Sequence, residues 1–372
     1  AKAKNMLYDW FVTFRKEGFT EWNSSPYLPI DTLGFGSLYA FAQDPAMREL
    51  GREGMDFAYY LLAVHSQQGI FASSSGRTYI KEQFGNWSNC PSGLSWIGYG
   101  YGVPGHAGKG ITSYCLSDYE PPKELAQWFS IPRGKEMICQ TTQGNDGYVD
   151  LYTYKTADYM MTSANDFHPG EPGHQENPFQ LTFNAVAQLW VTHPGERVLF
   201  GAARPSYWAG NGTLPKVNQY KAFAGLIYDI APEHPVDFTH LYLPSMEFDR
   251  CEVEGKWAFV QLGSAYAAVY CSNGMRMQNF GSNKDRECIA EGRRCIWLVR
   301  AAQADEFAVF EDFKAAMRGA ALDADAEGRR YRFVDPVYGE LRCQWGETLY
   351  VNDAPMQYSG FDNYGKLTMQ EK

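Results

Sequence analysis

The chain has 372 residues and a formal net charge of −10, and 45% of its residues are hydrophobic. The acidic charge argues against nucleic acid and against anionic membrane surfaces as partners, because both repel a negatively charged protein. No apolar run reaches membrane-spanning length and no signal peptide is visible, so we expect no membrane partner. The length suggests two domains, and the hydrophobic content suffices for a sizeable core in each.

Eight cysteines are scattered through the chain, and no Cys-x-x-Cys pair occurs, which argues against a zinc ribbon. Several lie in apolar stretches, as Cys271 does, and this placement favours reduced core thiols over disulfides. Reduced thiols favour a cytoplasmic location, while a secreted or periplasmic one stays open. The chain begins with Ala1 and not with Met, so we also expect that further helices could precede it.

Residues 1–136 follow a helical rhythm, with apolar side chains three and four positions apart. Asp44 followed by Pro45 is a helix-start signal, since Asp caps a helix and Pro is tolerated at its first position. The stretch Gly69–Gly110 has little periodicity but many aromatic residues, so we expect an ordered, functional loop there. The predicted helices are Asn5–Lys16, Asp31–Gln43, Pro45 to about Ser66, and Pro121–Phe129.

From about Met137 the pattern changes to a period of two, which is typical of strands. The predicted strands are Tyr148–Tyr154, Ala157–Ser163, Gln180–Phe183, Ala187–Val191, Trp257–Leu262 and Ala265–Cys271, followed by a helix at Glu311–Arg318 and strands near 331–334, 341–345 and 348–351. Their number and spacing predict an antiparallel β-sandwich over residues 137–372. The predicted fold class is therefore α+β, with a helical domain at residues 1–136 ahead of the sandwich.

Three polar clusters are candidates for a binding cleft, each with a simpler alternative. The turn Glu21–Tyr27 holds Trp22, Asn23 and Tyr27, although it could serve only to cap the next helix. His65 ends the third predicted helix, where it could act only as a C-terminal cap. His174 and Glu176 lie in a Gly/Pro-rich turn before a strand, where polar side chains line either a wet cleft or a surface hairpin.

Arg77 and Tyr79 are two residues apart in a Ser/Gly-rich segment, so in an extended conformation they share a face. They could be a surface pair. With an Asn and a His nearby, however, they are also what β-elimination from a uronic acid requires. Arg or Asn neutralises the sugar carboxylate and acidifies the neighbouring carbon, while Tyr or His removes the proton and Tyr returns it to the leaving oxygen.

These segments resemble heparinase II/III-like polysaccharide lyases over most of the chain. Asn23–Phe41 is similar to the family's Asn-Asn-His segment, with Asn23 at the carboxylate-binding Asn and Ser24 in place of the usual His. Gly69–Tyr79 resembles the loop that carries the catalytic Tyr, and His174 falls where the family has its catalytic His. The resemblance implies a partial α/α toroid followed by an antiparallel β-sandwich. It also implies a lyase that cleaves acidic poly- or oligosaccharides.

The resemblance also bears on metal and sugar contacts. His193 and His240 fall near the family's structural metal ligands, but only His174 is present where the motif usually has a second ligand. We therefore expect no cofactor, with a divalent metal as the alternative. Trp208 lies in an aromatic, Gly-rich segment that could form a sugar platform or only a loop at a sheet edge.

Two other functions remain open from the sequence. A glycoside hydrolase needs paired carboxylates, and the acids near the proposed cleft are Glu21, Asp31, Glu82, Glu171 and Glu176. The pair to suspect is Glu21 beside Asn23 and Glu176 beside His174. A non-catalytic glycan-binding protein is the third reading, supported by Ser24 replacing the usual His. A homo-oligomer is compatible with all three.

Overall fold

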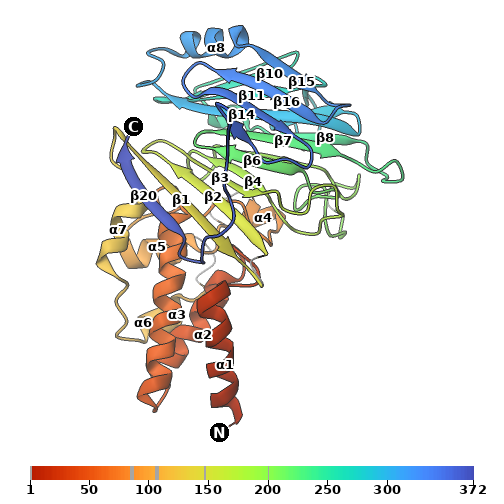
Figure 1. The fold of residues 1–372 in the computed structure, drawn as a ribbon. Coiled ribbons are helices and arrows are strands. Elements are labelled where there is room, and N and C mark those ends of the chain that lie inside the picture. Colours follow the sequence, from red (N-terminus) through yellow and green to blue (C-terminus); the bar gives the residue numbers. More distant parts are fainter. Residues whose placement is uncertain (1, 84–87, 105–108, 146–147, 200) are drawn as a thin grey trace.

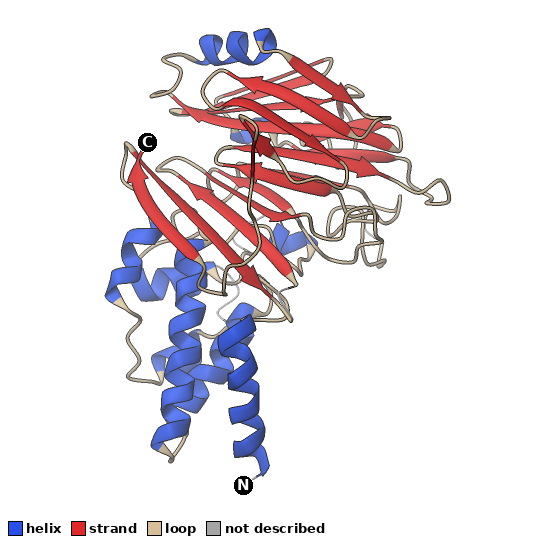
Figure 2. Cartoon of the chain, viewed as in Figure 1, coloured by secondary structure: helices blue, strands red, loops and turns tan. Residues whose placement is uncertain are grey.

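The computed structural model describes all residues except 1, 84–87, 105–108, 146–147 and 200. It has a helical N-terminal part followed by antiparallel sheets, so the α+β prediction is confirmed (Figure 2). The change from helix to strand falls at Lys135, close to the predicted boundary. Figure 1 shows α1, α2 and α3 at one end of the molecule and α8 at the opposite end.

The first three helices match the helical rhythm of the sequence. Helix α3 begins where Asp44 accepts a hydrogen bond from the Ala46 amide, as its Asp-Pro signal predicts. Helix α2 begins earlier than predicted, since Pro29 occupies its first turn. The helices are α1 (Lys2–Glu17), α2 (Leu28–Phe41), α3 (Pro45–Val64), α4 (Ile80–Gln83), α5 (Ser92–Tyr99), α6 (Ile111–Cys115), η1 (Lys123–Leu125), α7 (Ala126–Phe129), η2 (Ser245–Glu247) and α8 (Phe310–Gly319).

The strands form three antiparallel sheets within the described residues. Their orders are β12-β13-β8-β5-β4-β3-β2-β1-β20, β6-β7-β14-β11-β10-β9 and β15-β16-β17-β18-β19. The strands are β1 (Lys135–Gln143), β2 (Val149–Lys155), β3 (Met160–Asn165), β4 (Phe179–Thr182), β5 (Gln188–Thr192), β6 (Lys216–Tyr220), β7 (Phe223–Asp229), β8 (Phe238–Tyr242), β9 (Arg250–Glu254), β10 (Trp257–Leu262), β11 (Ala265–Cys271), β12 (Arg276–Met277), β13 (Glu287–Glu291), β14 (Arg294–Gln303), β15 (Leu322–Asp325), β16 (Arg330–Asp335), β17 (Gly339–Gln344), β18 (Tyr350–Val351), β19 (Ala354–Pro355) and β20 (Lys366–Glu371).

The two larger sheets bury one hydrophobic core between them. Alternate side chains of the nine-stranded sheet, such as Tyr154, Leu181 and Val191, enter this core together with Leu226 and Val299 of the six-stranded sheet. The alternation follows from the period of two that the sequence shows.

A second core joins the helices to the edge of the nine-stranded sheet. Phe57 and Leu61 of α3 belong to the same cluster as Met137 and Cys139 of β1, and Leu367 of β20 packs against it. Strand β20, at the end of the chain, pairs with β1, which begins the sheet. This long-range pairing was not predicted, because β20 is short, largely exposed and far away in sequence.

The other face of the nine-stranded sheet, which we call the outer face, carries buried polar side chains. Thr153, Lys155, Thr162, Gln180 and Thr182 alternate with the core residues and are all buried. The helical part and the segment after α3 cover them, and this buried polar face positions the candidate site.

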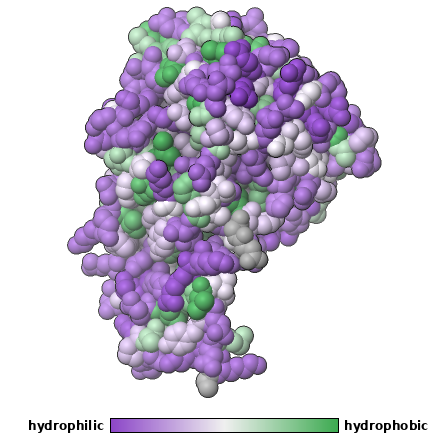
Figure 3. Space-filling view, in the orientation of Figure 1, coloured by the Kyte–Doolittle hydropathy of each residue, from purple (hydrophilic) through white to green (hydrophobic). Residues whose placement is uncertain are grey.

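Figure 3 shows hydrophilic residues over most of one face of the molecule, with small hydrophobic patches between them. Among the described residues, no helix has the length and apolarity that crossing a bilayer requires. The eight cysteines are all free thiols, as predicted.

Lys155 gives a testable consequence of the polar outer face. Its amino group donates to the carbonyls of Ala63 and Trp128, at the ends of α3 and α7, and burial lowers its pKa to about 7. Unfolded Lys155 binds a proton up to a pKa of about 10.4. The folded state therefore holds fewer protons above pH 7, and this group makes stability rise with pH by about 1.4 kcal/mol per pH unit. We expect Lys155→Met to remove that rise between about pH 7 and 9 in chemical denaturation. An unchanged slope would contradict the buried, deprotonated state.

Candidate active site

The segment Ser73–Tyr79 crosses the outer face and gathers residues distant in sequence. The amide of Ser74 donates to the Thr162 hydroxyl at 2.7 Å, and Ser75 pairs with Asn177 in an antiparallel bridge. The Thr78 amide donates to the carbonyl of Gln175 at 3.0 Å. These bonds align the segment with residues 175–177, which directly precede β4. They thereby place Arg77 and Tyr79 near the beginning of that strand.

Arg77 is held by several side chains of this site. Its Nε donates to Glu21 at 2.7 Å, and its Nη1 donates to Gln175 Oε1 at 2.9 Å. Its guanidinium also lies over the ring of Tyr27, 5.4 Å from the centroid. Because Glu21 neutralises the charge of Arg77, the attraction of Arg77 for a substrate carboxylate is weakened. The structure thus assigns it a positioning contact that the sequence did not predict.

Tyr79 has the most favourable surroundings for a phenolate. Its hydroxyl oxygen lies 3.5 Å from that of Tyr27, and Arg204 lies over its ring at 5.6 Å from the centroid. The hydrogen bond with Tyr27 lowers the pKa of Tyr79, and Arg77 and Arg204 lower it further against the opposing effect of burial. The same hydrogen bond raises the pKa of Tyr27. A tyrosine with a lowered pKa is suited to accept a proton.

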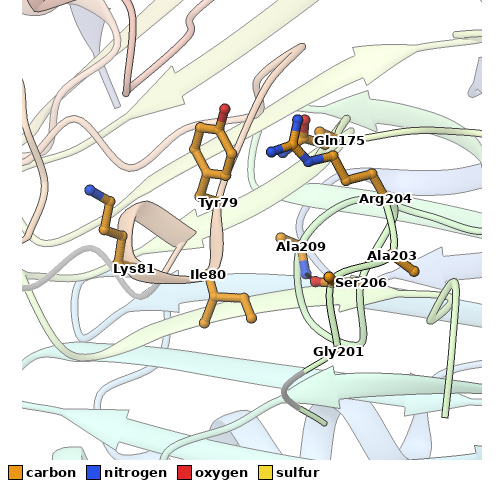
Figure 4. A pocket seen from close by; sticks show the side chains of 10 residues that line it. Tyr79, Ile80, Lys81, Gln175, Gly201, Ala203, Arg204, Ser206 and Ala209 are labelled. Atoms are coloured by element: carbon orange, nitrogen blue, oxygen red, sulfur yellow. Dashed lines mark hydrogen bonds between the residues drawn. The ribbon is translucent and has the colours of Figure 1, made fainter. Parts of the chain in front are cut away.

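Tyr79 opens onto a pocket of about 480 Å³ between the helical part and the loop 201–209. Figure 4 shows Tyr79, Ile80 and Lys81 on one side of the pocket and Arg204 on the other. The loop is held in place by Glu196, whose carboxylate accepts the Ala203 amide at 3.0 Å. The space is comparable with small-molecule sites, which usually exceed about 300 Å³.

Arg204, Lys81 and Gln175 were missed as site residues in the sequence. Arg204 is exposed, and among the described residues no carboxylate forms an ion pair with it. Lys81, by contrast, lies 3.2 Å from the carboxylate of Glu82. Arg204 directly precedes the aromatic segment that the sequence had singled out, and this adjacency was the one available signal.

Asn23 lies behind Tyr79, in a smaller cavity that Thr78 also lines. It is 2% exposed and adopts a left-handed backbone conformation with φ of 45°, which Asn tolerates better than most residues. Its Nδ2 donates to the carbonyl of Ser74 at 3.4 Å. Asn23 is therefore adjacent to the segment that carries Tyr79 but does not line the larger pocket.

Only the backbone of His174 lies next to the site, and its side chain does not. Its neighbour Gln175 bonds Arg77, and its own amide donates to the carboxylate of Glu176. The imidazole is exposed, and in the described part of the chain its ring has no hydrogen-bond partner. Of the four predicted catalytic residues, Arg77 and Tyr79 are thus in one group, Asn23 is behind them, and the His174 ring does not line the pocket.

Three residues predicted to contact a substrate are buried, which corrects that expectation. Trp22 is 1% exposed and packs on Phe167. Trp208 is 2% exposed and stacks on His240, with ring centroids 4.1 Å apart. Neither ring presents a face to a sugar, because neighbouring side chains already occupy it.

His65 is the third of these predicted substrate contacts that is buried. Its position agrees with the alternative prediction that it ends a helix. It is the C-cap of α3, and its Nδ1 is 2.9 Å from the Thr153 hydroxyl. Burial, and then the nearby Lys155, lower its pKa to about 3, so it is neutral and structural. Tyr27 is the one predicted aromatic contact that remains exposed, at 37%.

Each of the two histidines considered for a metal has a protein partner at one ring nitrogen, while its other ring nitrogen is buried and has no hydrogen-bond partner among the described residues. His240 Nδ1 is 2.7 Å from Glu287, and His193 Nε2 is 3.2 Å from the carbonyl of Val236. Burial, followed by the charge of His234, lowers the pKa of His193 to about 3. No group of three His, Cys, Asp or Glu side chains in the described residues could hold a metal ion.

The carboxylates near the site differ strongly in their surroundings. Glu21 is paired with Arg77, whereas Asp31 is partly buried and has its pKa raised to about 7, first by burial and then by the charge of Glu21. Glu82 is buried beside Lys81, and Glu171 is exposed. Glu176 is held by the His174 amide, so the pair suspected from sequence, Glu21 and Glu176, is engaged elsewhere.

The environment of Tyr79 predicts its titration. In isotope-labelled protein, the Tyr79 resonance should shift with pH at a lower value than the usual tyrosine pKa of about 10. Tyr27→Phe should raise this pKa, because it removes the main stabilising hydrogen bond, and Arg204→Gln should raise it by less. The matched control is Arg342→Gln, since Arg342 lies over the ring of Tyr350 in the third sheet. A Tyr79 resonance that titrates at or above the usual value would contradict the site.

No protein-family model matches this sequence, and a search of curated proteins finds no significant match.

Proposed function

We propose that this chain is a carbohydrate-active enzyme, a lyase that cleaves uronic-acid-containing poly- or oligosaccharides by β-elimination. The observation that carries the proposal is Tyr79, whose pKa is lowered by Tyr27 and by two arginines where it opens onto a pocket. The resemblance of the surrounding segments to heparinase II/III-like lyases supports the same reaction. Under this proposal the helices belong to a partial α/α toroid, and the sheets form its sandwich domain.

Arg204 is the residue best placed to bind the sugar carboxylate. It lies across the pocket from Tyr79 and has no carboxylate partner among the described residues (Figure 4). Its guanidinium would neutralise the carboxylate and so acidify the adjacent C–H. Arg77, already paired with Glu21, would keep Tyr27 and Gln175 in position.

Tyr79 would then move the proton. Its phenolate takes the proton from the carbon next to the carboxylate, the electron pair forms a carbon–carbon double bond, and the bond to the glycosidic oxygen breaks. The phenol that results returns the proton to the leaving oxygen, which restores the phenolate. Tyr27 stabilises the phenolate by donating its own hydrogen bond.

Substitutions in the pocket test the lyase. Tyr79→Phe should lower kcat by roughly 10²–10⁴-fold while substrate binding is nearly kept, because only the proton transfer is lost. Arg204→Gln should weaken binding as well, since it contacts the carboxylate already in the ground state. The readout is the ultraviolet absorbance of the unsaturated uronate product over a panel of uronate polysaccharides and their oligosaccharides. Tyr350→Phe and Arg342→Gln are matched controls, being another tyrosine and arginine stacked together in a different sheet.

A glycoside hydrolase is the second candidate, and Asp31 favours it. Its pKa of about 7 favours the protonated carboxyl up to neutrality, while Glu21 beside it forms an ion pair with Arg77. Two carboxyl groups with such different environments suit a general acid and a charged partner.

The pH dependence separates the two enzymes. A hydrolase that uses Asp31 as its acid loses activity as pH rises through about 7, because Asp31 must be protonated. A lyase that uses the Tyr79 phenolate instead gains activity as pH rises towards the Tyr79 pKa. We expect the second profile, with Asp31→Asn retaining most activity. If the wild type instead produces new reducing ends without ultraviolet absorbance, and Asp31→Asn abolishes them, the enzyme is a hydrolase and not a lyase. Binding without any product would indicate a glycan-binding protein.

A further inference from the structure

A small cavity lies behind the segment that carries Arg77 and Tyr79. Its described walls include nine polar side chains, among them Asn23, Thr78, Glu82, Gln83 and Asn177. We call it the Asn23–Asn177 chamber. Its volume of about 10 Å³ leaves room for one water molecule or one ion.

The walls present buried oxygen atoms that have no partner. Asn23 Oδ1, Asn177 Oδ1, Glu82 Oε2 and Gln83 Oε1 are four buried acceptor oxygens without a hydrogen-bond partner among the described residues, and the Gln83 Nε2 donor is also unbonded. The two asparagines are oriented by their amide nitrogens, which donate to the Ser74 carbonyl and to Gln180 Oε1. Their oxygens must therefore remain acceptors. Leaving so many buried acceptors unsatisfied is costly, which points to an occupant.

The chemistry of these atoms favours a cation over water. A water molecule supplies two protons for these four oxygens, whereas a cation can be ligated by several oxygens together. Amide and carboxylate oxygens are the ligands that hard cations prefer. Glu82 is the one carboxylate, and its other oxygen already lies 3.2 Å from Lys81 and accepts from the Cys90 thiol. So little negative charge suits a monovalent ion better than a divalent one.

We propose that the Asn23–Asn177 chamber binds a single dehydrated alkali cation, Na⁺ or K⁺. The ion joins the turn at Asn23, helix α4 at Glu82, and the bridge between Ser75 and Asn177. It thereby fixes the segment whose opposite side presents Arg77 and Tyr79. This site does not depend on the reaction proposed above, and its test needs no activity.

Thermal unfolding in different salts tests the chamber. The melting temperature should rise saturably with NaCl or KCl when N-methylglucamine chloride keeps the ionic strength constant. The salt that gives the larger rise identifies the ion. Glu82→Gln and Asn177→Leu should each abolish most of the rise. Asn363→Leu is the matched control, because Asn363 is equally buried but bonds Phe14 outside the chamber.

A crystal soaked in a thallium salt gives the direct readout. Anomalous density in the chamber, contacted by the Asn23, Glu82 and Asn177 oxygens, supports the ion. Equal melting temperatures in all three salts, or a water molecule alone in the chamber, overturns it. If Asn177→Leu fails to fold, the near-isosteric Glu82→Gln still decides the outcome.

Discussion

The candidate site depends on hydrogen bonds between the outer face of the nine-stranded sheet and the backbone that covers it. Thr162 accepts the Ser74 amide at 2.7 Å, and Thr182 donates to the Ala72 carbonyl at 2.6 Å. Buried polar groups need partners, and here the chain following α3 supplies them. The same contacts that satisfy the sheet therefore fix the extended segment on which Arg77 and Tyr79 lie.

Electrostatics then divides the arginines of the site between two tasks. Glu21 binds Arg77 and makes it part of the scaffold, with Tyr27 beneath it and Gln175 beside it. Arg204 has no carboxylate partner within the described ranges, and at the pocket its charge also favours the ionised form of Tyr79. The negative charge of Glu21 acts on Asp31 as well and helps to keep that carboxyl protonated near neutrality.

Burial lowers the pKa of the basic groups that lie between the helices and the sheet. Lys155 and His65 are both fully buried, and neither has a carboxylate partner in the described part of the chain, so both favour their neutral forms. Lys155 satisfies the carbonyl ends of two helices, and His65 ends one of them. These groups stabilise the contact between helices and sheet and take no part in the pocket.

The sequence by itself determined the elements whose physics is local. The helical period, the Asp44-Pro45 start and the period-two strands predicted α1, α3, β10 and β11 closely, because these signals lie within a few residues of one another. It also singled out Arg77 and Tyr79 as candidates, since their spacing places them on one face of an extended segment. Tertiary structure alone decided which charges remain free and which rings are buried. Glu21 engages Arg77 across 56 positions, His240 stacks on Trp208, and β20 pairs with β1 from the end of the chain. Such pairings depend on contacts that form only when distant segments pack together, and no local pattern in the sequence encodes them.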